Sequence, residues 1–214
     1  MSAEERRRAA RFAFAPDRDR FIVGRARLRQ ILARYVAQRP EALTFRYGPH
    51  GKPSLATARA APFFNLSHSD DLAALAITSA CDIGIDIERI RTVPAAVARR
   101  FFAAYENAAL LRLDGADWLA GFFHCWTRKE AVIKAVGKGL AFPLKSFAVS
   151  LLPGKLARVV HIGGCTEAGR EWALADLTLG PGLAGAIAAR TMGVRLSVRR
   201  RRCGEVCCQR LLGA

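Results

Sequence analysis

Two carboxylates on one predicted strand are the first feature of this sequence that could carry chemistry. Asp86 and Glu88 lie in the stretch "DIGIDIERIR", where apolar residues alternate from Ile83 to Ile87 as in a half-buried strand. Successive side chains of a strand point to opposite faces, so Asp86 and Glu88 project to the same face, roughly 7 Å apart. Two like charges held this close repel each other, so a stabilising group is expected between the two carboxylates.

A third carboxylate lies on the apolar side of a predicted helix over residues 117–140. Glu130 follows Trp126 by four residues in the apolar stripe, and an isolated buried charge is costly, so Glu130 must be paired, protonated or metal-bound. Lys134, one turn on, allows a simple i,i+4 ion pair. Taken together, three carboxylates suit Mg²⁺, and a nearby ammonium would balance phosphate charge. The pattern predicts phosphoryl-type chemistry on a nucleotide-like substrate.

The elements that must position these residues indicate an α+β fold. An amphipathic helix with a basic outer face is predicted over 17–39, then a short strand and turn over 43–56 and two strands over 62–78. The strand of Asp86 is followed by short helices over 95–102 and 106–113, and the long helix ends at Gly137 and Gly139. Further strands are predicted over 146–152, 172–179 and 182–189.

Each half of the chain therefore runs from a helix into hairpin-like strands, which indicates a duplicated α+β unit. We expect an N-terminal half over residues 1–80 and a C-terminal half over 81–194 that carries the three carboxylates. Residues 195–214 form a basic tail that contains cysteines.

Composition narrows the class of protein. The chain has 214 residues and is 51% apolar, which is enough for a substantial core. No apolar run approaches the roughly 18 residues of a membrane span, and the charged N-terminus does not resemble a signal peptide. We therefore expect a cytoplasmic protein without membrane contact. The six cysteines form no disulfide framework, and "CGEVCC" lacks a second ligand pair, so we expect no zinc site.

The net charge of +16 is concentrated at the two ends of the chain. Residues 1–39 hold eleven Arg against four acidic residues, and residues 190–214 hold seven Arg against one Glu. Such a field favours an anionic partner: a nucleic acid, a phosphate-rich small molecule or an acidic protein. A basic nucleic-acid-binding protein is one alternative, but it leaves the three carboxylates unexplained. Another Mg²⁺-dependent nucleotide transferase is a second alternative.

Two motifs together resemble the paired signature of the 4′-phosphopantetheinyl transferase superfamily. "IGIDIE" is followed by "WTRKEAVIK" with 39 residues between Asp86 and Trp126, and every fixed position of the family's pattern is filled. The segments "YGPHGKP", "FNLSHS", "RRFF" and "GKGL" occur in the family's order, so the resemblance covers roughly residues 7–149. The length is similar to that of the surfactin-synthetase-activating, or Sfp, type. This resemblance implies a monomer of two similar α+β halves related by a pseudo-twofold axis.

The resemblance implies a role for each matching residue. Asp86, Glu88 and Glu130 match the Mg²⁺ ligands, and Lys134 matches the lysine that reaches the phosphates of coenzyme A. Asp86, Glu130 and Lys134 are then the catalytic residues. Coenzyme A binding is implied for Arg20, Lys52, Ser67, His68, Lys129 and Lys134. Within this set Lys129 is a supporting cation, whereas Lys52, Ser67, His68 and Arg20 hold the adenosine and 3′-phosphate end, with Arg8 adding to Arg20. Glu106 matches a family carboxylate of undefined role.

The implied activity is that of a holo-[acyl-carrier-protein] synthase. A serine of an apo acyl, peptidyl or aryl carrier protein attacks the β-phosphate of coenzyme A, and 3′,5′-ADP leaves. Glu130 takes the serine proton, directly or through a metal-bound water. The implied partners are coenzyme A and an acidic carrier protein, with no nucleic acid. Family members usually have a further segment, including a strand, before "RRRAARF", so either the start is misassigned or the first half lacks an edge strand.

Overall fold

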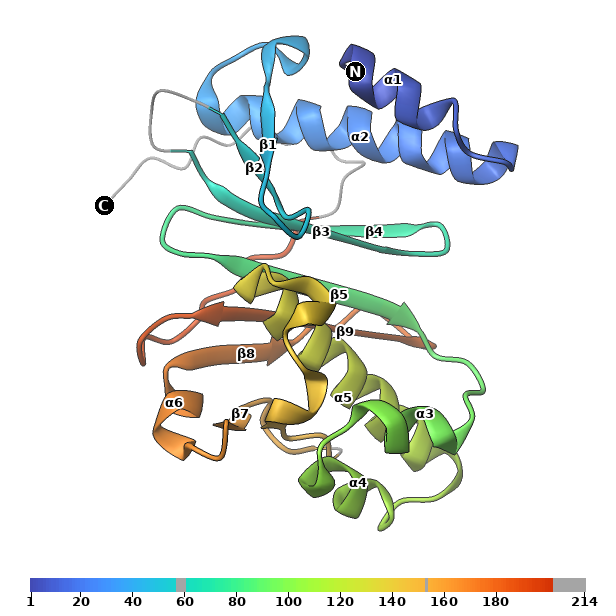
Figure 1. The fold of residues 1–214 in the computed structure, drawn as a ribbon, viewed down its shortest axis with the longest axis vertical. Helices are drawn as coiled ribbons and strands as arrows, with labels where there is room; N and C mark the ends of the chain where they lie inside the picture. Colours follow the sequence, from blue (N-terminus) through green and yellow to red (C-terminus); the bar gives the residue numbers. More distant parts are fainter. Residues whose placement is uncertain (57–60, 153, 202–214) are drawn as a thin grey trace.

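The computed structural model describes residues 1–56, 61–152 and 154–201, which form two α+β halves stacked along the longest axis of the molecule (Figure 1). The elements of the N-terminal half are α1 (Ala3–Ala9), α2 (Ala15–Val36), β1 (Phe45–Tyr47), β2 (Pro53–Leu55), β3 (Phe63–Ser69) and β4 (Leu72–Thr78). Those of the C-terminal half are β5 (Ile83–Arg89), α3 (Ala95–Phe101), α4 (Ala104–Leu110), α5 (Gly115–Val136), β6 (Phe147–Val149), β7 (Val159–Ile162), α6 (Thr166–Arg170), β8 (Trp172–Asp176) and β9 (Leu183–Arg190). Short 3₁₀ turns occur at Pro40–Ala42, Gly139–Ala141 and Leu144–Ser146.

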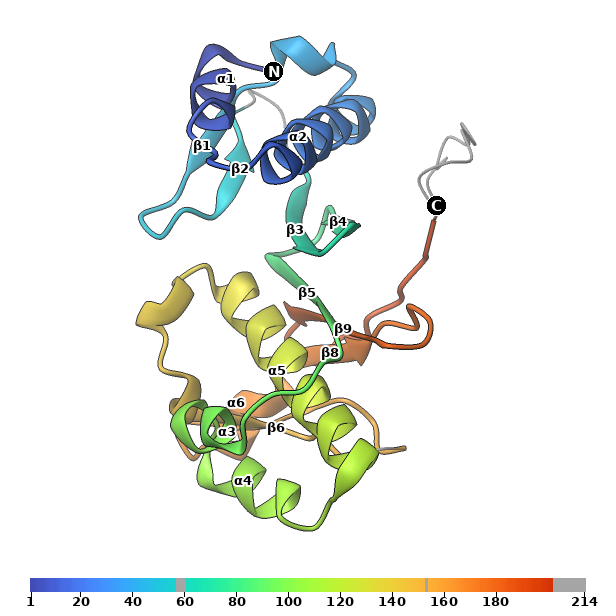
Figure 2. The ribbon, with the colours of Figure 1, turned by 90° about the vertical axis from the view of Figure 1, so that its right-hand side faces the viewer.

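The N-terminal half is built around α2, which lies over the β3–β4 hairpin (Figure 2). Phe64 on β3 and Leu28 and Leu32 on α2 are buried in one apolar cluster. Helix α1 is fastened to α2 by a buried carboxylate, because Glu5 accepts hydrogen bonds from the side chains of Arg25 and Arg29, each at 2.8 Å. A capping box at Ser2 satisfies the first amide groups of α1.

The C-terminal half contains a three-stranded antiparallel sheet, in the order β5-β9-β8, covered on one face by α5, and a separate antiparallel pair, β6–β7. Ala184, Ala186 and Ala188 of β9 pack against the α5 side, where small side chains let the helix approach closely. Gly84 of β5 also lets α5 approach closely, because a Cβ at this position would lie 2.0 Å from the carbonyl oxygen of Ala131 in α5. The close contact holds α5 directly over the strand that carries Asp86 and Glu88.

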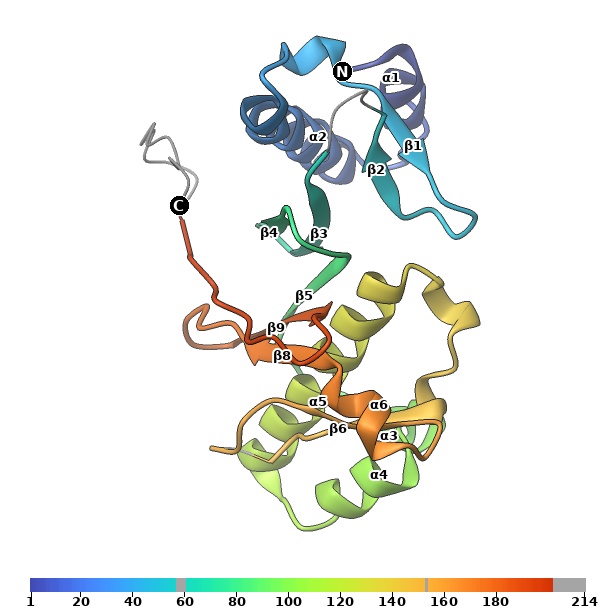
Figure 3. The same cartoon turned by 90° about the vertical axis from the view of Figure 1, so that its left-hand side faces the viewer.

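The opposite face of this sheet carries its own apolar cluster. Ile83, Ile85 and Ile187 are buried there, and Leu196, from the extended segment after β9, packs against them. That segment runs along the side of the sheet away from α5 and reaches toward the N-terminal half (Figure 3). Strand β5 is thus apolar on one face and polar on the face toward α5, as its alternating sequence predicts.

The mixed α+β fold with two halves, expected from the sequence, is confirmed. Each half contains one helix of 22 residues, α2 or α5, beside antiparallel strands. Helix α5 ends as expected, with Gly137 in the left-handed conformation at φ 74°. Helix α2 ends at Val36, three residues before the expected end at residue 39, because Ala37 already adopts φ 51°. The sequence pattern did not reveal α1, β2, β7 or α6.

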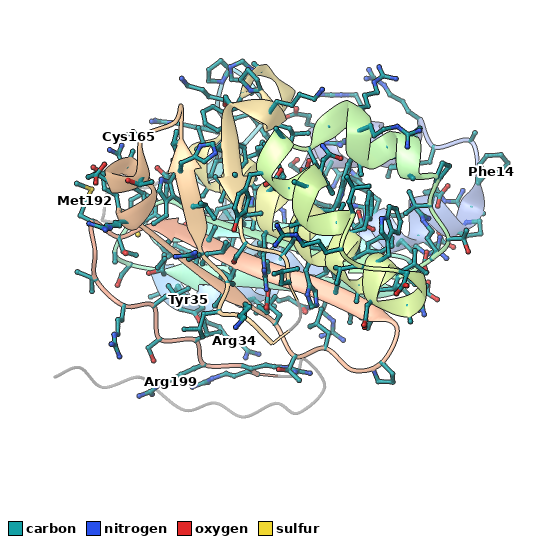
Figure 4. The ribbon with its side chains drawn as sticks, turned by 90° about the horizontal axis from the view of Figure 1, so that it is seen from below. Phe14, Arg34, Tyr35, Cys165, Met192 and Arg199 are labelled. Atoms are coloured by element: carbon teal, nitrogen blue, oxygen red, sulfur yellow. The ribbon has the colours of Figure 1, made fainter. Side chains whose placement is uncertain are left out.

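The described part of the C-terminal tail, residues 195–201, is irregular and exposed except for Leu196. In Figure 4, Arg199 lies at the edge of the molecule, and Phe14 lies at the opposite end from Cys165 and Met192. Cys81, Cys125 and Cys165 are free thiols, whereas Cys203, Cys207, Cys208 and the "CGEVCC" motif lie outside the described residues. Within the described ranges, none of the helices has both the length and the apolar character needed to span a membrane.

Candidate active site

A pocket of about 330 Å³ lies at the junction between the two halves. It is lined by residues of β3, β5 and α5, namely Leu66, Ser67, His68, Asp86, Glu88, Trp126, Glu130 and Lys134. The structure therefore brings together six of the residues predicted to form the site: Asp86, Glu88, Glu130, Lys134, Ser67 and His68. Its volume is at the lower end of the range for small-molecule pockets.

Asp86 is the most enclosed carboxylate of the pocket, with 4% of its surface exposed. Its Oδ1 accepts hydrogen bonds from Lys134 Nζ at 2.6 Å and from Ser67 Oγ at 3.0 Å. Its Oδ2 is buried and has no hydrogen-bond partner among the described residues. Burial raises the pKa of Asp86, although the Lys134 ammonium opposes that effect. A buried carboxylate oxygen without a partner is costly, so Oδ2 is suited to a cationic ligand.

Glu88 and Glu130 add two partly buried carboxylates to the same pocket. Burial raises the pKa of Glu88, and the negative charge of Asp86 raises it further. Burial likewise raises the pKa of Glu130, with Asp86 again adding to the effect. The three carboxylates therefore repel one another in a poorly solvated place, and an additional positive charge would relieve that repulsion.

Lys134 is the cation that the structure places in this pocket. Its ammonium bonds both Asp86 and the hydroxyl of Ser67, the latter at 3.0 Å, and 29% of its side chain is exposed. It therefore pairs with Asp86 across the helix–strand contact, rather than with Glu130 in the i,i+4 pair considered above. Trp126 lines the same pocket and stacks on Phe122, which fixes the wall beside Glu130.

The donor chemistry of the pocket fits a hard divalent cation, since Asp86, Glu88 and Glu130 supply carboxylate oxygens and Asp86 Oδ2 is unsatisfied. These side chains line one pocket but do not close around one point: within the described ranges, no three acidic, histidine or cysteine residues are arranged tightly enough to hold an ion. The Lys134 ammonium instead occupies the position beside Asp86 Oδ1.

Lys52 and Arg20 lie outside the lining of this pocket. Lys52 Nζ bonds Asp82 at 2.6 Å and the carbonyl oxygen of Ala135 at 2.8 Å, so it joins the N-terminal half to the end of α5. Arg20, half exposed, bonds Asp71 in the β3–β4 turn at 2.9 Å and Asp17 at 3.2 Å. Both cations are paired with exposed carboxylates, which a phosphate group could replace.

Lys129 is placed away from the pocket. It is fully buried, and its ammonium bonds both oxygens of Glu106, at 2.6 and 2.7 Å, and the carbonyl oxygen of Phe147 at 2.7 Å. Glu106 also accepts from the backbone amide of Val149, so the pair ties α5 to α4 and β6. Burial raises the pKa of Glu106, which Lys129 counteracts. The Lys129–Glu106 pair therefore stabilises the packing of these elements, and Lys129 is the ion-pair partner of Glu106.

Arg8 lines a different hollow. Arg7, Arg8, Arg11, Glu4 and Phe12 surround a pocket of about 600 Å³, which shares no lining residue with the carboxylate pocket. The Arg8 guanidinium lies over the ring of Phe21, 5.3 Å from its centroid. The structure therefore does not bring Arg8 together with the carboxylates.

Ser69 and Asn65, whose side chains bond β5 beside the pocket, were not predicted from the sequence. The signal was present in "FNLSHS", where polar residues 65, 67 and 69 alternate with apolar Phe64 and Leu66. Such alternation puts the three polar side chains on one face of β3. The association of the two halves decides that β5 lies opposite this face of β3. The local sequence pattern carries no information about that association.

Comparison with known proteins gives the class. A family model described as "4'-phosphopantetheinyl transferase superfamily" matches residues 82–188, and one described as "4'-phosphopantetheinyl transferase, N-terminal" matches residues 1–80. The chain therefore belongs to the 4′-phosphopantetheinyl transferase superfamily. This assignment favours a phosphopantetheinyl transferase over the two alternatives, which were a nucleic-acid-binding protein and another Mg²⁺-dependent nucleotide transferase.

The relatives place the chain with the Sfp type. It is 35% identical to the 4'-phosphopantetheinyl transferase HetI of Nostoc sp. over 197 residues, which are 90% of this chain and 80% of the relative. It is 40% identical to psf-1 of Bacillus pumilus over 153 residues, 71% of this chain and 64% of the relative. Identity to Sfp of Bacillus subtilis is 35% over 151 residues, 71% of this chain and 66% of the relative. The matched part thus spans less than two thirds of psf-1 and of Sfp.

Proposed function

We propose that this protein transfers the 4′-phosphopantetheine arm of coenzyme A onto a serine of an apo carrier protein and releases 3′,5′-ADP. The observation that carries the proposal is the pocket at the junction of the two halves. Its three carboxylates and one ammonium stand at the positions of the family's paired signature. The family's known substrates, coenzyme A and a carrier protein, supply the anionic group and the hydroxyl that such a pocket could use.

Asp86, Glu88 and Glu130 are the proposed ligands of a Mg²⁺ ion. The unsatisfied Oδ2 of Asp86 and the raised pKa values of all three carboxylates support this role, because a bound cation would relieve both. When bound, Mg²⁺ would neutralise charge on the pyrophosphate of coenzyme A.

Lys134 is the proposed contact to the transferred phosphate. Its ammonium already lies beside Asp86 and Ser67 and is partly exposed, so it can bond a phosphate oxygen without leaving the pocket. A fixed cation in a poorly solvated site stabilises the negative charge that develops during phosphoryl transfer. Ser67 and His68, which line the pocket from β3, remain proposed contacts of the adenosine and 3′-phosphate end of coenzyme A.

Glu130 is the proposed general base. Its carboxylate lines the same pocket as Asp86 and Lys134, so it can accept a proton, directly or through a water, from a hydroxyl that approaches a phosphate there. It removes the proton from the carrier serine while the serine oxygen forms a bond to the β-phosphorus. The bond from that phosphorus to the bridging oxygen breaks, and 3′,5′-ADP carries the electron pair away. These changes account for each bond and for the proton, so the reaction needs no further reactant.

Lys52 and Arg20 remain proposed contacts of the adenosine and 3′-phosphate end of coenzyme A, with Arg8 as a more distant addition. The exposed pairs of Lys52 with Asp82 and of Arg20 with Asp71 support exchange for a phosphate. For Lys129 we propose a structural role instead, because its ammonium is enclosed by Glu106 and Phe147. This role replaces the supporting phosphate contact expected from the sequence.

The proposed protein partner is an acidic carrier domain, and the proposed active form is a monomer. Arg27 and Arg34, exposed and seven residues apart on one face of α2, would attract such a carrier. Both walls of the pocket come from one chain, so the site needs no second copy. Incubation with coenzyme A, Mg²⁺ and a panel of apo carriers tests the activity: the intact mass of a competent carrier should rise by one phosphopantetheinyl group.

A further inference from the structure

Strand β3 holds the edge of β5 through side chains instead of through its backbone. Three polar side chains, which we name the β3 polar ladder, accept hydrogen bonds from alternate backbone amides of β5: Asn65, Ser67 and Ser69. The bonded amides are those of Ile85 at 2.9 Å, Ile87 at 3.2 Å and Arg89 at 3.0 Å, respectively. The other edge of β5 pairs with β9, so these amides would otherwise be left without partners at the junction of the halves.

The two serines of the ladder make a second contact that the asparagine does not. Ser67 Oγ donates to Asp86 Oδ1 at 3.0 Å, and Ser69 Oγ donates to Glu88 Oε2 at 3.3 Å. A hydroxyl has one donor hydrogen and two acceptor lone pairs, so each serine can hold the amide and the carboxylate at once. The residue before Ile85 is Gly84, which has no side chain for Asn65 to hold.

The Ser69 end of the ladder is fixed independently of the carboxylate. The residue after Ser69, Asp70, turns the hairpin with φ 49°, and its carboxylate bonds the side chain of Arg89. Arg89 is therefore bound through both its amide and its guanidinium to the tip of the β3–β4 hairpin. Ser69 Oγ is consequently held in place relative to β5 by more than its bond to Glu88.

We propose that Ser69 is a positioning residue that holds the Glu88 carboxylate toward the pocket, as Ser67 does for Asp86. Glu88 needs such a contact because its long side chain is only partly buried and is repelled by Asp86. The orientation of both strand carboxylates is then tied to the register between the two halves of the chain. The inference rests on the proposed function in taking Glu88 as a metal ligand.

The test is direct binding of Mn²⁺, as a probe for Mg²⁺, to the full chain with coenzyme A present, followed by electron paramagnetic resonance of the free ion. Ser69→Thr and Ser69→Val form a matched pair of nearly equal shape, of which only threonine keeps the hydroxyl. Contacts of this kind typically contribute tenfold or more to metal affinity, so Ser69→Val should raise the dissociation constant about 10-fold. Ser69→Thr should restore it to near the wild-type value.

Asn65→Ala is the control for a merely structural role, because Asn65 bonds the Ile85 amide but holds no carboxylate. It should lower the unfolding midpoint in urea and leave the Mn²⁺ dissociation constant of the folded protein unchanged. Equal affinity in Ser69→Val and wild type, or an equal loss in Asn65→Ala, would overturn the inference. Wild type that binds Mn²⁺ but transfers no phosphopantetheine overturns the proposed function alone, whereas wild type that binds no Mn²⁺ overturns both.

Discussion

The Lys134 ammonium lies 2.6 Å from Asp86 Oδ1 and joins helix α5 to strand β5 inside the pocket. The same ammonium bonds Ser67 of β3, so it contacts elements of both halves of the chain. Three carboxylates line this pocket, and the pKa of each is raised, which shows that one ammonium does not offset their burial and mutual repulsion. The pocket can therefore accept additional positive charge. It can also accept an anionic group that contacts both this charge and Lys134.

Lys134→Met should lower the rate of phosphopantetheine transfer by about 100-fold or more, because it removes the cation nearest the developing phosphate charge. Initial rates at saturating coenzyme A, followed by the mass of the carrier, measure this loss. Lys138→Met is the matched control, since Lys138 is exposed one turn further along the chain. Comparable rates in Lys134→Met and Lys138→Met would show that Lys134 has no part in the transfer.

Removing one partner of the buried Lys129–Glu106 pair should destabilise the fold. Lys129→Met and Glu106→Gln should each lower the free energy of unfolding by about 3–5 kcal/mol, because each leaves a buried charge uncompensated. The double variant should lose less than the sum of the two. Urea unfolding measures all three, with exposed Lys145→Met as the control. If Lys129 contacts the substrate instead, Lys129→Met will abolish transfer in a protein of unchanged stability.

The Glu5 clamp between α1 and α2 predicts a pH-dependent contribution to stability. Burial alone would raise the pKa of Glu5, but hydrogen bonds from Arg29, the Ser2 amide and Arg25 outweigh it and lower the pKa from 4.5 to about 2. A lowered folded-state pKa stabilises the fold above the unfolded pKa, and this stabilisation is lost as pH falls toward the folded pKa. The contribution should therefore be complete above about pH 5 and disappear between pH 4.5 and 2.

Comparison of wild type with Glu5→Gln isolates that contribution. The difference in the free energy of unfolding should be about 3 kcal/mol at neutral pH and should shrink as pH falls below 4.5. Glu4→Gln, an equal change of charge at an exposed position of the same helix, should cost less than about 0.5 kcal/mol. A difference between wild type and Glu5→Gln that does not vary with pH would contradict the clamp.

Much of the pocket could be predicted because its residues follow short-range periodicities. The i,i+2 spacing puts Asp86 and Glu88 on one face of a strand, and the i,i+4 spacing puts Glu130 and Lys134 on one side of a helix. The glycine at the end of α5 and the strand alternation around Ile85 are equally local signals. The inclusion of Ser67 and His68 in the site required the family resemblance, because their local spacing alone does not indicate a site.

Other features were decided by tertiary packing, which local patterns do not contain. At 100° per residue, Lys129 and Lys134 point about 140° apart around α5, so they cannot both face the pocket. That spacing could have excluded Lys129 in advance, but its partner, Glu106, becomes evident only when α4 packs on α5. Helix α1 was not predicted because it buries only Glu5 and Ala9. Its sequence therefore shows no apolar periodicity.

The most direct test of the central claim is the mass of an apo carrier protein after incubation with coenzyme A, Mg²⁺ and this protein. A characterised transferase first establishes that the carrier is competent. Wild type and Glu167→Gln, an exposed control, should add one phosphopantetheinyl group, and Glu130→Gln should be slower by about 100-fold or more. No mass gain on a competent carrier would contradict the proposed activity, and full activity in Glu130→Gln would contradict the site described here.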